Sequence, residues 1–261
     1  MRTVSHVLAD QAGPKAIRLA DFPVQVYFSL MSAGNMSPRW EEQWGSEKTA
    51  QVNQERLFDL LGLPKAREIH MLPTHLANSR IVDTRHCGLT IKSDILLTRA
   101  TEILLTLFPA DCFPIVITNK EGSFIVLLHG SVWAVNKGLI RRALLRIRRT
   151  YHQFPSELYA AVGPGIRECC YISESTVGKL SPNQEWSFYL LNRSRVDLIG
   201  FINNQLARQG IPADNIVDLG LCTSCTWTQD AGHLFFSNLR SQRGGEPEGR
   251  FAVVTTRAAS P

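Results

Sequence analysis

Residues 108–133 read FPADCFPIVITNKEGSFIVLLHGSVW, two apolar runs joined by the polar segment NKEG. Runs rich in Val, Ile and Phe are typical of β-strands, and we expect strands over 113–118 and 123–129. A four-residue loop between them closes a hairpin. In the register set by that loop, Cys112 lies directly opposite His129, with both side chains on one face of the sheet.

A thiol and an imidazole in neighbouring strands have two interpretations. They are near enough to touch each other or to bind one metal ion. Cysteine is also among the most buried residue types, and such a pair is more often packing than chemistry. The hairpin by itself leaves both interpretations open.

The residues after His129 suggest an anion site. Gly130 and Ser131 are expected to end the strand and begin a helix, with Ser131 as the N-cap. Free backbone N–H groups at a helix start favour an anion such as phosphate, and they lower the pKa of a nearby thiol. Asp111, next to Cys112, is expected to orient a ligand or balance a cation.

The remaining pattern predicts an α+β fold with a mixed, largely antiparallel sheet flanked by helices. Further strands are expected at 23–30, 93–98, 103–108, 157–163, 215–221, 233–238 and 250–256. Helices are expected at 48–61, 131–151 and 195–209, the first and third ending at Gly62 and Gly210.

Length and composition indicate an ordinary globular chain. Its 261 residues are 44% hydrophobic and contain no visible internal boundary, so we expect one compact domain over 1–261. No apolar run reaches the ~18 residues of a membrane span, and the first residues lack a long secretory stretch, which predicts a cytoplasmic location. Much of the net charge of +5 lies in RRALLRIRRTYH, typical of a solvated helix face, so we expect no nucleic-acid or membrane partner. The six cysteines are expected to be reduced thiols.

Several segments resemble the bacterial YfiH-like, or laccase-domain, family. PADCFPIVITNKEGSFIVLLHGSVW is similar to the ADC-L-P-V and H-A-G-W-R-G segments of that family, with the same spacing from cysteine to histidine. SDILLT, AAVGPGIRECCYIS and LCTSCTWTQDAGHLFFSNLRSQRGG resemble further family segments in the same order. The resemblance covers at least residues 93–256.

The resemblance implies an α/β or α+β fold, a metal site of two histidines and one cysteine, and cleavage of purine nucleosides by phosphate. Adenosine deamination and methylthioadenosine cleavage are further family activities. Carried over, the metal-binding and catalytic residues are Cys112, His129 and, in MLPTHLANSRIVD, His75. The resemblance, rather than spacing, selects His75 over His70 and His86. Three protein ligands with an open fourth position suit catalytic zinc, whereas multi-copper sites need more histidines than this chain readily supplies.

The sequence departs from the family pattern where anions are handled. After His129 it reads GSVWAV in place of A-G-W-R-G, and YFSLMSAGNMS replaces F-S-T-R-x-G-G-V-S, so two arginines are missing. Pro109 and Leu76 also differ from the family. Arginine clamps phosphate with two parallel hydrogen bonds, so we expect altered phosphate handling. Arg240, in a Gly-rich segment, is a candidate substrate ligand, with a solvated loop as the equal alternative.

Two cysteine pairs remain. Cys222 and Cys225 form a lone CxxC, which we interpret as structure near the site rather than as a zinc knuckle or redox motif. Of Cys169 and Cys170, one thiol is expected to be buried, while the other or Tyr171 faces the pocket.

The leading hypothesis is a zinc-dependent purine nucleoside phosphorylase whose partners are a nucleoside and phosphate. The alternative is a metal-free hydrolase or deamidase in which Cys112 is the nucleophile and His129 its base. A third hypothesis is a divergent member that binds a ligand without turnover. The sequence carries no indication of the oligomeric state.

Overall fold

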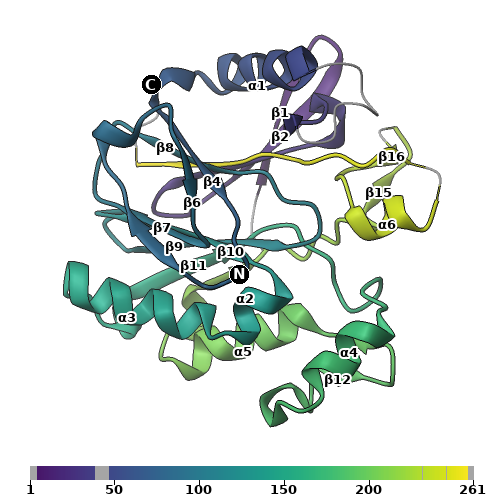
Figure 1. The fold of residues 1–261 in the computed structure, drawn as a ribbon. Helices are drawn as coiled ribbons and strands as arrows, with labels where there is room; N and C mark the ends of the chain where they lie inside the picture. The colour runs from purple at the N-terminus through teal and green to yellow at the C-terminus, as the bar shows by residue number, and fades with distance from the viewer. Residues whose placement is uncertain (1–4, 39–46, 231, 245, 258–261) are drawn as a thin grey trace.

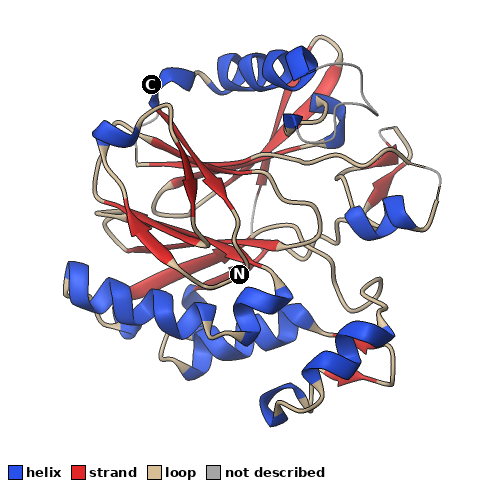
Figure 2. Cartoon of the chain, in the orientation of Figure 1, coloured by secondary structure: helices blue, strands red, loops and turns tan. Residues whose placement is uncertain are grey.

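Two β-sheets packed against each other form the centre of the fold, and helices cover their outer faces (Figures 1 and 2). The computed structural model describes residues 5–38, 47–230, 232–244 and 246–257. The expected domain of 1–261 therefore includes short segments outside the described residues. In the described ranges, no helix is both long and apolar enough to span a membrane.

The first sheet has seven strands in the order β1-β2-β3-β17-β8-β4-β6. Its strands are β1 (Ser5–Asp10), β2 (Gly13–Leu19), β3 (Gln25–Ser29), β4 (Glu68–Leu72), β6 (Thr90–Lys92), β8 (Leu104–Leu107) and β17 (Val253–Thr256). β4 runs parallel to β6 and β8, and the other pairs are antiparallel.

The second sheet has six strands in the order β14-β11-β9-β10-β7-β5. Its strands are β5 (Ser79–Ile81), β7 (Ile95–Thr98), β9 (Phe113–Asn119), β10 (Ile125–Gly130), β11 (Leu158–Val162) and β14 (Ile216–Asp218). The edge strands β5 and β14 pair in parallel, and the three inner pairs are antiparallel.

The helices complete a layered arrangement. α1 (Glu47–Leu61) packs on the outer face of the first sheet, and α2 (Val132–Asn136), α3 (Leu139–Tyr151) and α5 (Leu198–Arg208) cover the second (Figure 1). Smaller elements lie in the connections. These are α4 (Glu174–Leu180), α6 (Asn238–Gln242), the ribbon of β12 (Leu190–Leu191) and β13 (Arg195–Val196), and the ribbon of β15 (Trp227–Thr228) and β16 (Gly232–His233).

Strand β9 explains why the central runs are uninterruptedly apolar. Ile115 and Ile117 point toward the helices, while Val116 between them points into the core that the two sheets share. Side chains alternate along a strand, so a strand covered on both faces must be apolar at every position. Each such buried Val or Ile contributes roughly 1.5–3 kcal/mol of stabilisation.

The α+β prediction with largely antiparallel pairing is confirmed, but there are two main sheets where one was expected. The single helix expected over 131–151 is wrong, because Gly138, with φ 82°, separates α2 from α3. The helix expected from 195 begins only at Leu198, after Asp197 accepts a 2.8 Å hydrogen bond from the Gly200 N–H. The strand expected at 233–238 is wrong, because only His233 belongs to a strand, β16, while Phe235 and Phe236 pack into the inter-sheet core.

Candidate active site

The β9–β10 hairpin places Cys112 beside His129, but in a register different from the expected one. His129 pairs with Pro114 rather than directly with Cys112, so the predicted pairing is wrong by two residues. The cause is the loop, in which Asn119 extends β9 and its Oδ1 accepts hydrogen bonds from Ser123. A shift of two residues keeps side chains on the same face. Cys112 and His129 accordingly line the same hollow, where the thiol lies close enough to the imidazole to influence its charge.

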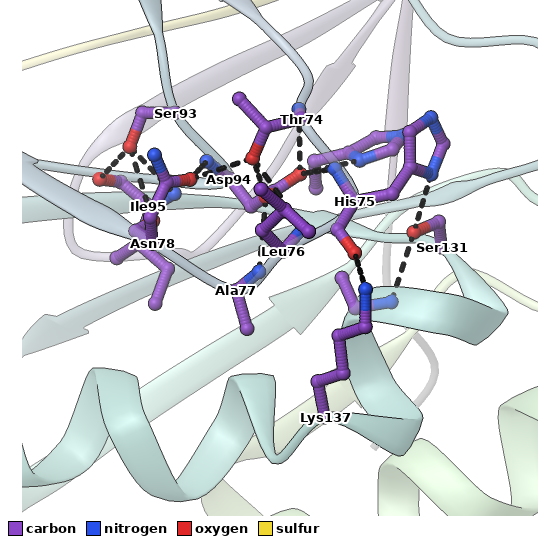
Figure 3. A network of polar contacts seen from close by, with 12 residues as sticks. Thr74, His75, Leu76, Ala77, Asn78, Ser93, Asp94, Ile95, Ser131 and Lys137 are labelled. Carbon is purple, nitrogen blue, oxygen red and sulfur yellow. Dashed lines mark hydrogen bonds and ion pairs between the residues drawn. The ribbon is translucent and has the colours of Figure 1, made fainter.

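Asp94, fully buried just before β7, lies beside the turn that carries Thr74 and His75 and organises the site (Figure 3). Six donors converge on its carboxylate. They are the backbone N–H groups of Thr74, His75, Leu76 and Ala77, the Thr74 hydroxyl and Nδ1 of His129. One side chain therefore fixes both the 74–77 turn and the ring of His129. Sequence reasoning did not single out Asp94, although it lies in the SDILLT segment.

The charges of these groups reinforce one another. Burial alone would raise the pKa of Asp94, but hydrogen bonds from His129, Thr74 and the turn outweigh it and hold that pKa well below its usual range. Burial lowers the pKa of His129, whereas the neighbouring Cys112 and Asp94 raise it to about 9. The site therefore favours an ionised Asp94 that orients the His129 ring.

His75 reaches the same site from the turn. Its backbone is left-handed, with φ 60°, and its ring meets that of His129 edge to face at 4.9 Å between centroids. Nδ1 of His75 lies 2.9 Å from Oγ of Ser131, the N-cap of α2, which also accepts a hydrogen bond from the Ala134 N–H. Burial and the nearby His129 lower the pKa of His75. The sequence-level rivals lie elsewhere: His86 caps a turn with Asp83, and His70 packs on Phe108.

His75, Cys112 and His129 offer the nitrogen and sulfur atoms that a zinc site uses. The Nδ1 contacts with Ser131 and Asp94 leave Nε2 of each histidine available, as oriented metal-binding imidazoles require. The three residues line one hollow of about 300 Å³. In the described part of the chain, the group whose ligand atoms all lie within 4.8 Å of one another is a set of four cysteines, so this trio is more widely spaced. Their role as ligands stays a prediction.

A second hollow of about 180 Å³ adjoins the first, since both are lined by His75, Ala110 and Cys112. Its walls include Trp133, Tyr171 and Leu198, which form an apolar, partly aromatic surface. The larger hollow is more polar and is lined by Ser37, His70 and Arg250, among others. The two hollows can accept a molecule with one flat apolar part and one polar part.

The structure also places three further candidates from the sequence, Asp111, Gly130 and Ser131. Asp111 is buried and accepts hydrogen bonds of 2.7 Å from the Thr223 hydroxyl and from the Leu239 N–H, so its carboxylate ties loops together. Gly130 belongs to β10, where a side chain would collide with the Phe113 carbonyl. Ser131 caps α2 as expected. Their roles in substrate binding stay predictions.

Arg240 is held within the protein. Its guanidinium pairs with Glu246 and donates to the backbone carbonyls of Thr223, Ser224 and Phe235. These contacts join the 223–224 turn to α6. A direct contact between Arg240 and substrate would have to replace some of them, and it likewise stays a prediction.

The family model for multi-copper polyphenol oxidoreductase laccase matches residues 33–258. That range includes the hairpin, the Asp94 turn and both hollows. The chain belongs to this family. The resemblance drawn from the sequence motifs is thereby confirmed.

Curated relatives of this laccase-family chain carry nucleoside names. The purine nucleoside phosphorylase YlmD of Geobacillus stearothermophilus is 29% identical over 215 residues, which are 76% of each chain. The adenosine deaminase RL5, from an unknown prokaryotic organism, is 25% identical over 182 residues, which are 64% of this chain and 67% of the relative.

Solved structures confirm the fold of this laccase-family chain. The crystal structure of YlmD from Geobacillus stearothermophilus has a TM-score of 0.80 at 24% identity and covers 97% of this chain and 100% of its own. The YfiH protein of Bacillus licheniformis has a TM-score of 0.82 at 21% identity and covers 95% and 98%. At these identities the likeness concerns the fold alone.

Proposed function

We propose that this chain is a purine nucleoside phosphorylase in which His75, Cys112 and His129 hold a zinc ion. The observation that carries the proposal is the Asp94 network, which orients His129 and the His75 turn while leaving both Nε2 atoms and the Cys112 thiol for a ligand. Zinc with an open position would polarise a substrate oxygen or activate a bound water. Relatives named purine nucleoside phosphorylase and adenosine deaminase support the substrate class.

The lining of the two hollows suggests how the substrate is oriented. We assign the purine base to the smaller hollow, where Trp133 and Tyr171 offer aromatic faces. Phosphate is assigned to the larger hollow, where Arg250 supplies a guanidinium that also pairs with Glu248 at 2.8 Å. A phosphate oxygen then attacks C1′, the bond from C1′ to the base nitrogen breaks, and the base leaves with that electron pair and takes a proton. The products are a ribose 1-phosphate and the free base.

The test is release of base from adenosine and inosine, followed by chromatography with and without phosphate. We expect phosphate-dependent base release that Cys112→Ala abolishes and that the control Cys87→Ala retains, because Cys87 lies outside both hollows. Ammonia release without base would instead indicate adenosine deamination. If neither product forms, the chain is a ligand-binding member without turnover, and the proposal fails.

A thiol hydrolase is the second candidate, favoured by one observation. Cys112 lies beside His129, and Nδ1 of His129 is hydrogen-bonded to Asp94, so the three residues stand in the order nucleophile, base and orienting carboxylate. Zinc content separates the two candidates. A hydrolase would be active without zinc and inactivated by alkylation of Cys112, whereas the phosphorylase would lose activity with its zinc and regain it when zinc is restored.

A further inference from the structure

Four cysteines meet close to the start of β15 and to Arg243, which follows α6 and donates to the carbonyl of Cys170. The sulfur atoms of Cys169, Cys170, Cys222 and Cys225 all lie within 4.8 Å of one another, and those of Cys169 and Cys225 are 3.6 Å apart. A zinc ion with four sulfur ligands at ~2.3 Å in a tetrahedron separates those sulfurs by about 3.8 Å. The spacing of the cluster therefore suits a single ion bound at its centre.

The backbone brings the two pairs together across more than fifty residues. Gly165 and Cys222 form a parallel β-bridge, reinforced by the hydrogen bond from the Thr223 N–H to the Gly165 carbonyl at 3.1 Å. A side chain at Gly165 would collide with the Phe113 ring, so only glycine allows this close approach. The turn after Gly165 then carries Cys169 and Cys170 toward the CxxC segment.

The environment of Cys222 is that of a metal-bound sulfur. Cys222 is buried, and its sulfur accepts hydrogen bonds from the backbone N–H groups of Arg167, Ser224 and Cys225. Donors two and three residues after a CxxC cysteine stabilise negative charge on its sulfur. Two separate segments thus direct donors at one sulfur, an arrangement that packing alone does not require.

We propose that Cys169, Cys170, Cys222 and Cys225 bind one zinc ion in a structural site separate from the active site. Four sulfur ligands in a tetrahedron leave no open position, which distinguishes a structural zinc from a catalytic one. The CxxC was expected to stand alone, but the structure brings a second cysteine pair to it. One thiol of the Cys169–Cys170 pair was expected to be buried, but Cys169 is exposed and Cys170 is partly buried. Tyr171 does face the smaller hollow.

The cluster also supports the active-site loop. Thr223, next to Cys222, donates its hydroxyl to Asp111, and Asp111 precedes Cys112 in the chain. Arg240 donates hydrogen bonds to the Thr223 and Ser224 carbonyls of the same turn. Arg243 donates to the carbonyls of Cys170 and Ile172. A zinc ion bound by the four cysteines would fix the 222–225 turn, and Thr223 in that turn holds Asp111 by a hydrogen bond.

Metal analysis of the purified full-length chain tests the proposal. We expect Cys222→Ser and Cys225→Ser each to lose one equivalent of zinc per chain relative to the wild type, while the matched control Cys87→Ser keeps its metal. Cys112→Ser separates this site from the active site, because it should remove a different equivalent. Unchanged zinc in both CxxC variants, or iron in place of zinc, would overturn the proposal.

The wild-type protein provides a second measurement if those variants fail to fold. Cys169 and Cys225 are exposed, so without a metal they should react readily with iodoacetamide. We expect mass spectrometry to find them protected before treatment with a strong zinc chelator and modified after it, with Cys87 reacting equally in both samples. Alkylation of Cys169 and Cys225 before chelation would refute zinc binding. If a reductant rather than the chelator made these thiols reactive, zinc binding would also be refuted, and disulfides would be indicated.

Discussion

The Asp94 carboxylate accepts hydrogen bonds from both sides of the candidate active site. In Asp94→Asn one carboxylate oxygen becomes an NH₂ group, which would face N–H donors of the 74–77 turn or of His129. We expect zinc affinity, measured by competition with a chromophoric chelator, to fall about 10–100-fold, the usual effect of losing a partner of a ligating histidine. The matched control is Asp83→Asn, which alters an exposed carboxylate that caps a surface turn and should leave the affinity unchanged. Equal affinities in the two variants would contradict the assignment of Asp94.

Site residues differed in how far the sequence could reveal them. The predicted register of Cys112 and His129 was wrong by two residues, but the two residues were still expected close together, because a two-residue shift keeps side chains on the same face. His75 required the family resemblance, since its turn is placed by hydrogen bonds to a residue nineteen positions away. Asp94 was missed because nothing in its local pattern signals donors that come from two other segments.

Helix α3 ends at a residue whose backbone conformation favours glycine. His152 follows Tyr151 with φ 57°, and its N–H donates to the Arg148 carbonyl. A left-handed backbone costs a residue with a side chain roughly 1–2 kcal/mol. Glycine avoids that cost, but it also makes the unfolded chain more flexible, which offsets part of the gain. We expect His152→Gly to raise the free energy of unfolding by about 0.5–1 kcal/mol, measured by urea denaturation. His152→Ala keeps the strained conformation and should give no gain, so an equal gain from alanine would refute the explanation.

Helices and strands were predictable where their own residues determine them. They were not predictable where packing against other segments determines them. Eight of the nine expected strands have counterparts in the two main sheets, such as β3 and β17, because their apolar runs are continuous. Strands β1 and β2 were missed, since they form an edge hairpin whose residues are largely exposed or partly exposed. The helix expected over 131–151 failed at Gly138, where the apolar spacing continues while the backbone does not.

At the scale of the whole molecule, the two-sheet packing was not accessible from the sequence. A continuous apolar run indicates a strand buried on both faces, but it does not say whether helices or a second sheet supply the cover. Here helices cover one face of β9 and the first sheet covers the other. The same limit applies to the cysteine cluster, because a β-bridge between Gly165 and Cys222 brings together pairs that each looked isolated.

Stability of the whole fold should depend on His70 at acidic pH. His70 lies on β4 against Phe108, and its burial lowers its pKa to about 4, from about 6.5 when unfolded. Between these values the unfolded chain binds more protons than the folded one, so stability is lost as the pH falls from 6.5 toward 4. The full difference corresponds to roughly 3 kcal/mol, and because His70 is only partly buried we expect about 1–2 kcal/mol.

Urea denaturation at pH 7 and pH 4.5 measures this contribution when wild type is compared with His70→Gln, whose side chain does not titrate. Glu68, joined to His70 through the Thr106 hydroxyl, has a pKa raised by burial and changes stability in the opposite direction. It is present in both proteins, so the comparison isolates His70. We expect the wild type to lose about 1–2 kcal/mol more than His70→Gln on acidification, and the exposed control His152→Gln to follow the wild type. Equal losses in wild type and His70→Gln would show that His70 is protonated without cost in the folded protein.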